Sequence, residues 1–182
     1  MPRSLRKTAL KVASLPVPST KIQKAQSRQP KSKPVHIRPA TDADVPGMMR
    51  LAQHSATAAQ WSPQQYAALF SSTSPRRIAL VIEEASSVRG FLIAQAIPPD
   101  WEIENIAIDA DARRRGLGTR LLGEFLDRAR AEGAQAVFLE VRESNHAARA
   151  LYEKWAFVES GRRLRYYQNP QEDAIVYKHS FA

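Results

Sequence analysis

The sequence predicts a protein of the α/β class, with a mixed, twisted central sheet flanked by helices and preceded by a disordered basic tail. Three observations support this prediction. First, the chain has in succession a strand-like run at 101–108, a helical run at 117–131 and a strand-like run at 136–141, and a crossover of this length joins parallel strands. Second, apolar runs on either side of this unit pair as hairpins, which adds antiparallel strands. Third, a change in composition divides the chain into a tail (1–34) and one folded domain (35–182).

The domain is predicted to begin with an edge strand at 35–39, because the alternating pattern stops at a proline. A helix follows, with Thr41 or Asp42 as its cap and apolar residues at helical spacing on one face. A second helix begins at Pro63, since proline is favoured at the first helical position and Ser62 before it is a good cap.

The middle of the chain predicts two paired strands, a further strand and the longest helix. Residues 77–84 and 88–97 are apolar runs joined by serines, which indicates a hairpin, and 101–109 supplies the next strand. The helix that begins near Leu117 carries a wide apolar stripe, so it packs on the sheet, and Gly133 ends it.

The last part of the chain completes the sheet. Residues 136–141 form a short apolar run, interrupted by Glu140, of the kind found in a sheet covered on both faces. A further helix is predicted at 145–155, and residues 157–167 with 174–178 close the sheet as an antiparallel pair.

A basic glycine loop joins the central strand to the longest helix and reads Arg113-Arg114-Arg115-Gly116-Leu117-Gly118. Glycines two positions apart let the backbone turn tightly, and the following helix directs its unpaired amides and positive dipole end at an anion. The loop is therefore interpreted as a phosphate cradle. A Gly-x-Gly pair alone is weak evidence, and a solvated loop before a helix has the same pattern.

The net charge of +9 comes entirely from the first 35 residues, which hold nine Lys or Arg and no acidic residue, whereas the rest holds eighteen of each sign. Five prolines and many Ser, Thr and Gln residues leave too little apolar surface to offset the entropy of ordering, so this segment is predicted to be disordered. Three roles stay open: a ribosome or RNA tether, an organellar transit peptide, and a solubilising extension without a partner.

The chain contains no cysteine, which excludes disulfides, thiolate metal sites and any cysteine nucleophile. The four histidines share no ligand-like spacing, so no metal is expected. No apolar run approaches membrane-spanning length and no secretory signal is recognised, so neither a membrane partner nor secretion is expected.

Three segments around the glycine loop carry a family resemblance: Asn105–Asp109 before it, and Phe138–Asn145 and Ala150–Glu153 after it. Together with the loop they resemble the GNAT superfamily of acetyl-CoA-dependent N-acetyltransferases, and within it the bacterial enzymes that acetylate the N-terminal alanine of a ribosomal protein. The resemblance covers 35–182. It implies the GNAT fold, acetyl-CoA as co-substrate, the N-terminus of a ribosomal protein as the acceptor, and a cytoplasmic location.

The resemblance also implies a set of residues that bind acetyl-CoA. The pantetheine would lie along the central strand like an added strand, and a backbone amide there would polarise the acetyl carbonyl. Amides of the glycine loop would hold the pyrophosphate. The expected cofactor-binding residues are Ile106, Ala107, Ile108, Arg113, Arg114, Arg115, Gly116, Leu117, Gly118, Thr119 and Asn145, the last of which also has a competing role as helix cap.

Glu140 and Tyr152 are the candidate catalytic residues. Glu140 interrupts an apolar strand, where an unpaired carboxylate is unfavourable, so it either pairs with an arginine such as Arg142 or faces a wet cleft. The resemblance makes it the general base that takes the acceptor's proton. Tyr152 is either a core aromatic or, by resemblance, the acid near the thioester sulfur. A tyrosine pKa near ~10 against ~8.5 for a thiol favours stabilising the thiolate by a hydrogen bond.

Two glutamates on the central strand complicate this assignment. Glu104 shares a face with Ile106 and Ile108 by period-two alternation, and other acetyltransferases of the superfamily use a glutamate on this strand as base. Either Glu104 or Glu140 is therefore the base. Glu102 lies one step further from the cofactor, where it could receive a cationic amine. The alanine acetyltransferases that the chain resembles usually have an apolar residue at position 104.

Two other segments depart from the resemblance. The residue before Phe157 is Ala156, where these enzymes most often have glycine, and alanine would be strained if the helix end needs a positive φ. The segments 162–167 and 172–175 resemble the part that shapes the peptide-binding side, with altered spacing.

Three functions are weighed. An α-amine with a pKa near ~8 is roughly a tenth unprotonated at neutral pH, and a lysine near ~10.4 is below about one in a thousand, so a carboxylate base suits the α-amine better. An acetyltransferase for lysine or a small amine is the second reading, which Glu102 and Glu104 favour. The third is an inactive GNAT-like binding protein associated with nucleic acid through its tail, against which Glu140, Asn145 and Tyr152 argue.

Overall fold

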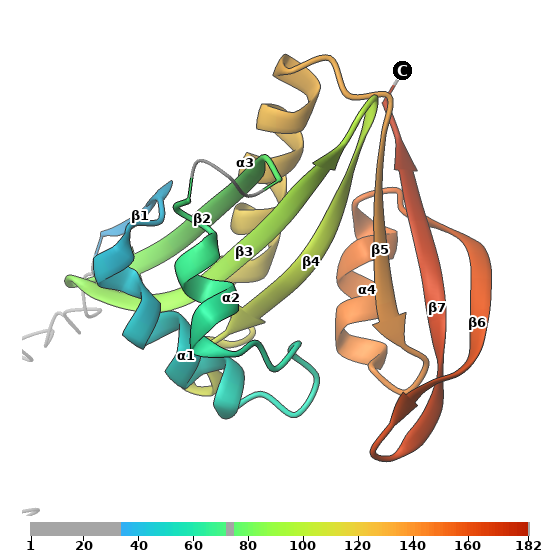
Figure 1. Cartoon of the computed structure of the whole chain (residues 1–182), viewed down its shortest axis with the longest axis horizontal. Helices are drawn as coiled ribbons and strands as arrows, with labels where there is room; N and C mark the ends of the chain where they lie inside the picture. Colours follow the sequence, from blue (N-terminus) through green and yellow to red (C-terminus); the bar gives the residue numbers. More distant parts are fainter. Residues whose placement is uncertain (1–33, 72–74, 182) are drawn as a thin grey trace, which may run out of the picture. The chain divides into compact units, whose positions relative to one another are not determined.

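The computed structural model describes residues 34–71 and 75–181, so the predicted basic tail lies outside the described residues except for Pro34. Within the described part, seven strands form one sheet in the order β1-β2-β3-β4-β5-β7-β6 (Figure 1). The strands are β1 (Val35–Pro39), β2 (Arg77–Glu84), β3 (Ser87–Ile97), β4 (Asp100–Ile108), β5 (Ala136–Arg142), β6 (Val158–Gln168) and β7 (Gln171–Ser180).

In the same described residues, four α-helices and two short 3-10 turns join these strands. They are η1 (Asp42–Asp44), α1 (Val45–Gln53), α2 (Pro63–Ala68), η2 (Ala110–Ala112), α3 (Leu117–Ala131) and α4 (His146–Lys154). The predicted start of α2 is confirmed, because Ser62 Oγ accepts a hydrogen bond from the amide of Gln65 at 3.3 Å and the Gln65 side chain accepts one from the amide of Ser62 at 2.8 Å.

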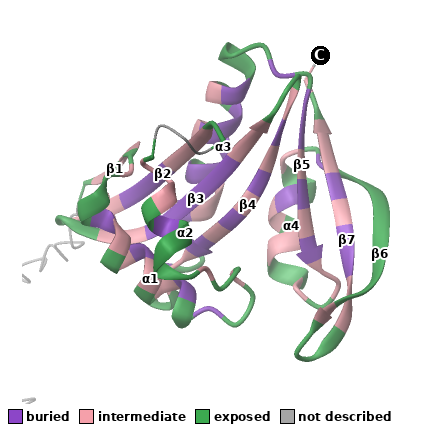
Figure 2. Ribbon diagram, viewed as in Figure 1, coloured by how far each residue is buried: buried purple, intermediate pink, exposed green. Residues whose placement is uncertain are grey.

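The predicted mixed sheet is confirmed. Strands β4 and β5 pair in parallel across α3, and every other neighbouring pair is antiparallel. Helices α3 and α4 pack on one face through Leu121, Phe125 and Tyr152, which are buried. Helices α1 and α2 pack on the other face through Met48 and Tyr66. We call these the α3 face and the α1 face. Figure 2 shows buried residues along β3 and β4 and exposed residues along the edge strand β6.

A β-bulge in β4 changes which residues share a face. Ile93 of β3 pairs with Asn105 and the next residue, Ala94, pairs with Ile103, so Glu104 is an extra residue without a partner in the register. Ile103 therefore faces α3, and so do Ile106 and Ile108 beyond the bulge. The expectation that Glu104 shares a face with Ile106 and Ile108 is wrong, because period-two alternation does not continue through a bulge.

Strands β4 and β5 separate halfway along their length. They pair only at Trp101–Val137, Glu102–Phe138 and Ile103–Leu139. Beyond this point β4 continues along β3 and β5 continues along β7, and Figure 1 shows the two strands diverging. We call the position after Ile103 and Leu139 the strand split.

Helix α4 ends in a turn that places alanine in a left-handed conformation. Ala156 has φ +57°. Its amide donates to the carbonyl of Glu153 at 3.0 Å, and the amide of Phe157 donates to the carbonyl of Tyr152 at 3.1 Å, which is the Schellman pattern. Helix α3 ends in the same pattern with Gly133 at φ +79°. The turn at the end of α4 is therefore built as a glycine turn is, and only the residue differs, with alanine in place of glycine.

We expect Ala156→Gly to stabilise the domain by about 0.5–1 kcal/mol, because glycine adopts a positive φ without steric conflict. Gly133→Ala is the matched control and should destabilise by a similar amount, since a Cβ there meets no atom within 4 Å and only backbone strain changes. Urea unfolding of both variants measures the two shifts. A lower unfolding midpoint for Ala156→Gly would show that its backbone is not strained.

Candidate active site

The edge of β4 beyond the strand split is open on the side of β5. The amide of Asp109 donates to the carbonyl of Arg89 in β3 at 2.9 Å, so by alternation Ala107 also directs its backbone groups at β3. Ile106 and Ile108 direct theirs at the open side, where no strand among the described residues pairs with them. An extended ligand could add to this edge as a strand does. The geometry favours Ile106 and Ile108 over Ala107, whose side chain packs on the α1 face.

The glycine loop places three unpaired amides at the beginning of α3. The first hydrogen bond of the helix runs from the amide of Arg120 to the carbonyl of Gly116 at 3.0 Å. The amides of Leu117, Gly118 and Thr119 therefore have no acceptor within the helix. Gly116 has φ +77°, which lets the chain turn into the helix there. Aligned amides at the positive end of a 15-residue helix form an anion site.

The three arginines of the loop have different surroundings. The Nε of Arg113 donates to the carbonyl of Ile108 at 3.3 Å, so this side chain closes the end of the open edge. Arg115 pairs with Glu84 of β2, with one N–H···O distance of 3.1 Å, which directs its guanidinium away from the loop amides. Arg114 is exposed and has φ +58°. Arg114, unlike Arg115, is therefore not held away from the phosphate site by an ion pair with β2.

Gly118 is a point of close packing as well as a loop glycine. A Cβ at this position would lie 3.3 Å from Leu151 Cδ2 of α4 and 3.6 Å from Ile108 Cγ1 of β4. The absence of a side chain lets the first turn of α3 approach the open edge of β4. Position 118 therefore sets the distance between the loop amides and the β4 edge.

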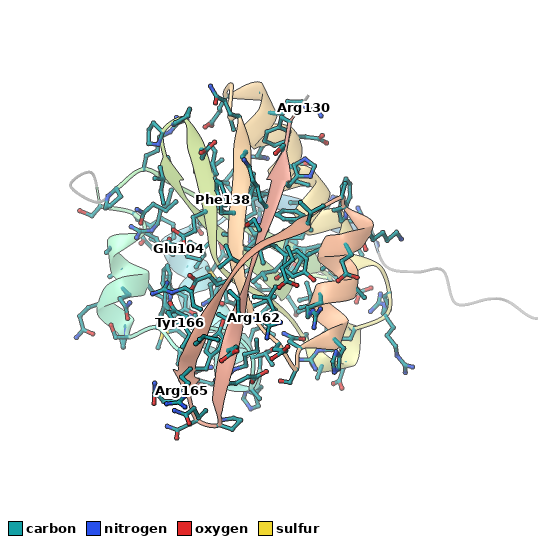
Figure 3. All side chains as sticks on the ribbon, turned by 90° about the vertical axis from the view of Figure 1, so that its right-hand side faces the viewer. Glu104, Arg130, Phe138, Arg162, Arg165 and Tyr166 are labelled. Atoms are coloured by element: carbon teal, nitrogen blue, oxygen red, sulfur yellow. The ribbon has the colours of Figure 1, made fainter. Side chains whose placement is uncertain are left out.

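A cavity of about 390 Å³ lies on the α1 face at the strand split. Its walls include Trp61, Arg77, Tyr166 and Tyr167. It also contains three carboxylates, from Glu102, Glu104 and Glu140, and we call it the acidic pocket. Figure 3 shows Glu104 and Tyr166 on the same side of the sheet, from β4 and β6 respectively.

Glu140 is the first residue of β5 beyond the strand split, and its carboxylate is held by β6. Its Oε1 accepts a hydrogen bond from Arg163 Nη1 at 2.6 Å. The Tyr166 hydroxyl also donates to this carboxylate, and that bond raises the pKa of Tyr166. Arg142 pairs instead with Glu172 at 3.2 Å, so the alternative of a Glu140–Arg142 pair is wrong. The Arg163 side chain is 55% exposed, so its pair with Glu140 is a weak, solvent-screened one.

Glu104 is held more firmly. Its carboxylate accepts hydrogen bonds from Arg77 Nε at 2.7 Å and from Nη2 at 3.1 Å. The Arg77 side chain is 16% exposed, and its guanidinium lies 5.9 Å from the centre of the Trp61 ring. A bidentate, shielded pair of this kind is costly to break, because it leaves a desolvated charge without a partner. Glu104 is therefore less available as a base than Glu140.

Tyr152 lies on the opposite face of the sheet from Glu140. Its ring contacts Phe157 and Tyr177 at centroid distances of 5.7 and 6.2 Å. Burial, together with nearby Tyr167, raises the pKa of the Tyr152 hydroxyl. Only a group that lies in the strand split can contact both candidate catalytic side chains. The raised pKa keeps the hydroxyl protonated, which supports hydrogen-bond donation over release of its proton.

Asn145 has the helix-capping role that competed with cofactor binding in the sequence. Its side-chain oxygen accepts a hydrogen bond from the amide of Ala148 at 3.2 Å at the beginning of α4.

The aromatic walls of the acidic pocket were only partly anticipated. Tyr167 is half-buried, and burial together with the neighbouring Glu140 raises its pKa to about 12. The resemblance assigned residues 162–167 to the side of the domain that binds the peptide. Nothing in the sequence indicated that Trp61 and Arg77 would line the pocket. Trp61 precedes α2, and Arg77 lies on β2 two strands away from β4, so both reach the pocket only in the assembled sheet.

A wider cavity of about 730 Å³ lies between α1 and the end of β4. Three arginines and three aspartates line it, so their charges balance, and it lies away from Glu140 and Tyr152. Among the described residues no group of three or more His, Asp or Glu side chains has the arrangement of a metal site. No helix in this part of the chain is both long and apolar enough to cross a membrane.

Comparisons with known proteins agree with this geometry. The model of the acetyltransferase (GNAT) family matches residues 46–157. A [ribosomal protein bS18]-alanine N-acetyltransferase of Salmonella typhimurium is 36% identical over 135 residues, which cover 73% of this chain and 88% of that protein. The enzyme of the same name from Haemophilus influenzae is 36% identical over 117 residues, 63% of this chain and 80% of that protein. The crystal structure of the ribosomal-protein-S18-alanine N-acetyltransferase from Escherichia coli superposes with a TM-score of 0.73 at 32% identity, covering 81% of this chain and 96% of that one.

Proposed function

Because the chain belongs to the acetyltransferase (GNAT) family and uses acetyl-CoA as its acetyl donor, we propose that its acceptor is the N-terminal α-amine of a ribosomal protein that begins with alanine. The observation that carries the proposal is the acidic pocket at the strand split. An amine arrives there as a cation, and the pocket offers carboxylates within aromatic walls. The names of the relatives from Salmonella typhimurium and Haemophilus influenzae support the choice of acceptor.

The open edge and the loop fit acetyl-CoA. Backbone groups of Ile106 and Ile108 would hold the pantetheine, and the amides of Leu117, Gly118 and Thr119 would hold the pyrophosphate. Bound in this way, acetyl-CoA supplies an activated acetyl group at the strand split.

In this proposal Glu140 is the general base. It lies at the strand split on the acceptor side, and its partner Arg163 is exposed to solvent, which screens the pair and makes it easy to release. The carboxylate takes one proton from the acceptor ammonium, which leaves a neutral amine to attack the thioester carbonyl. As the bond between nitrogen and the carbonyl carbon forms, the bond between that carbon and sulfur breaks and its electron pair stays on the sulfur. The second proton that the nitrogen loses goes to this thiolate, so CoA leaves as a thiol. Tyr152 donates a hydrogen bond to that thiolate from the other face.

A panel of N-terminal peptides tests the acceptor. We expect acetyl-CoA turnover with peptides that begin with alanine, and much lower kcat/KM with peptides whose α-amine is blocked and whose only amine is lysine. The opposite order would favour the lysine or small-amine alternative.

We also propose that the enzyme acts in the cytoplasm and that the basic tail tethers it to ribosomal RNA, because nine positive charges can neutralise phosphates without a fold. Deletion of residues 1–33 should leave thermal stability and the Kd for acetyl-CoA nearly unchanged. The full-length protein should co-sediment with ribosomes and lose that association steeply as salt rises, and the truncated protein should not co-sediment. Identical sedimentation of the two proteins at low salt would eliminate the tether.

A further inference from the structure

The three carboxylates of the acidic pocket differ in their partners. Glu104 is neutralised by Arg77 and Glu140 by Arg163, at N–O distances of 2.7 and 2.6 Å. Glu102 forms no ion pair or hydrogen bond with any described residue. With both arginines counted, the group therefore carries one uncompensated negative charge, and it belongs to Glu102.

The surroundings of Glu102 make this charge unfavourable without a ligand. The residue lies on β4 opposite Phe138 of β5, one step before the strand split, and is only partly exposed. Burial raises the pKa of Glu102, and the neighbouring carboxylates of Glu140 and Glu104 raise it further, while Arg163 lowers it. Lys178 shares this face beside Phe138, but its Nζ lies 5.5 Å from the centre of the Phe138 ring and forms no ion pair with Glu102.

We propose that Glu102 is the carboxylate on which the positively charged acceptor amine docks, so that it selects a cationic amine over an uncharged nucleophile. The inference rests on the proposed function, since it concerns the same pocket. An incoming ammonium group supplies the cation that Glu102 lacks and leaves the two existing pairs in place. Glu140, at the strand split, then accepts one proton from the docked ammonium, and Glu102 holds the remaining N–H groups.

Two peptides and four variants test this role. One peptide begins with alanine, and in its counterpart a hydroxyl replaces the α-amine, so that the two differ in charge at nearly equal shape. Isothermal titration against enzyme saturated with CoA at neutral pH gives both Kd values without turnover. Wild-type enzyme should bind the amine peptide about tenfold or more tightly than the hydroxyl peptide, as expected for a charge-assisted hydrogen bond.

Glu102→Gln keeps the shape and removes the charge, so the preference should fall to about twofold or less. Glu102→Asp keeps the charge and should retain most of the preference, which separates charge from folding. Glu140→Gln should also retain most of it, because Arg163 already neutralises that carboxylate. Glu124→Gln is the control, since Glu124 lies on α3 and pairs with Arg128.

An unchanged preference in Glu102→Gln overturns the assignment, as does an equal loss in Glu140→Gln. Wild-type enzyme that turns over the alanine peptide but shows no preference for the amine also overturns it, and leaves the proposed function intact. Wild-type enzyme that neither binds nor acetylates the alanine peptide contradicts both. The two failures are therefore distinguishable.

Discussion

Replacing Glu140 with glutamine should lower kcat by about 10²- to 10⁴-fold, the usual contribution of a general base. The Kd for acetyl-CoA should change little, because Glu140 faces the acidic pocket and the expected cofactor contacts come from β4 and α3. The acid limb of the pH profile of kcat should flatten, since glutamine has no proton to gain in this range. Steady-state kinetics across pH and titration with acetyl-CoA measure the three effects.

Glu104→Gln is the matched variant for this experiment. It breaks the shielded pair with Arg77 and should lower the free energy of unfolding by about 1–3 kcal/mol, because it leaves a desolvated guanidinium with a weaker partner. Its kcat should fall far less than that of Glu140→Gln. A large loss of kcat in Glu104→Gln with Glu140→Gln unaffected would move the base to β4 and weaken the choice of an α-amine acceptor.

Gly118→Val should weaken acetyl-CoA binding by about a hundredfold or more, since misplacing the loop amides by an ångström has effects of this size. The Cβ alone would lie 3.3 Å from Leu151, and the branched side chain would force α3 away from the β4 edge. Titration with acetyl-CoA measures the loss, and thermal unfolding shows whether the domain remains folded.

Two smaller changes control for this effect. Gly118→Ala adds only the Cβ, at distances of 3.3 and 3.6 Å from its neighbours, and should bind with intermediate affinity. Arg114→Ala removes one exposed charge from the loop and should weaken binding only modestly. If Arg114→Ala and Gly118→Val lose affinity equally, side-chain charge and not the backbone amides holds the pyrophosphate.

The sequence predicted the parallel pair of β4 and β5 because the pattern that decides it is local: two apolar runs and one amphipathic helix of the right length. The sequence also indicated that alanine before Phe157 would be strained if the end of α4 needs a positive φ, and the structure gives Ala156 a φ of +57°. Both features depend on residues close together in the chain.

The partners of the acidic residues could not be predicted in this way. Glu140 meets Arg163 because the order β5-β7-β6 and two register shifts in β6 bring positions 23 residues apart together. The bulge at Glu104 reverses the faces that alternation assigns to the residues on either side of it. The residue types around Glu104 do not indicate that the strand holds an extra residue there. The roles of Glu140 and Tyr152 came from resemblance and remain predictions. The structure contributes the finding that the two side chains lie on opposite faces of the sheet.

The central claim is that acetyl passes to an N-terminal α-amine held in the acidic pocket. The most direct measurement is tandem mass spectrometry of a single peptide that begins with alanine and contains one internal lysine, after incubation with enzyme and acetyl-CoA. We predict acetylation of the α-amine with the lysine unmodified, and loss of that product in Glu140→Gln. Acetylation of the lysine with a free α-amine would contradict the claim.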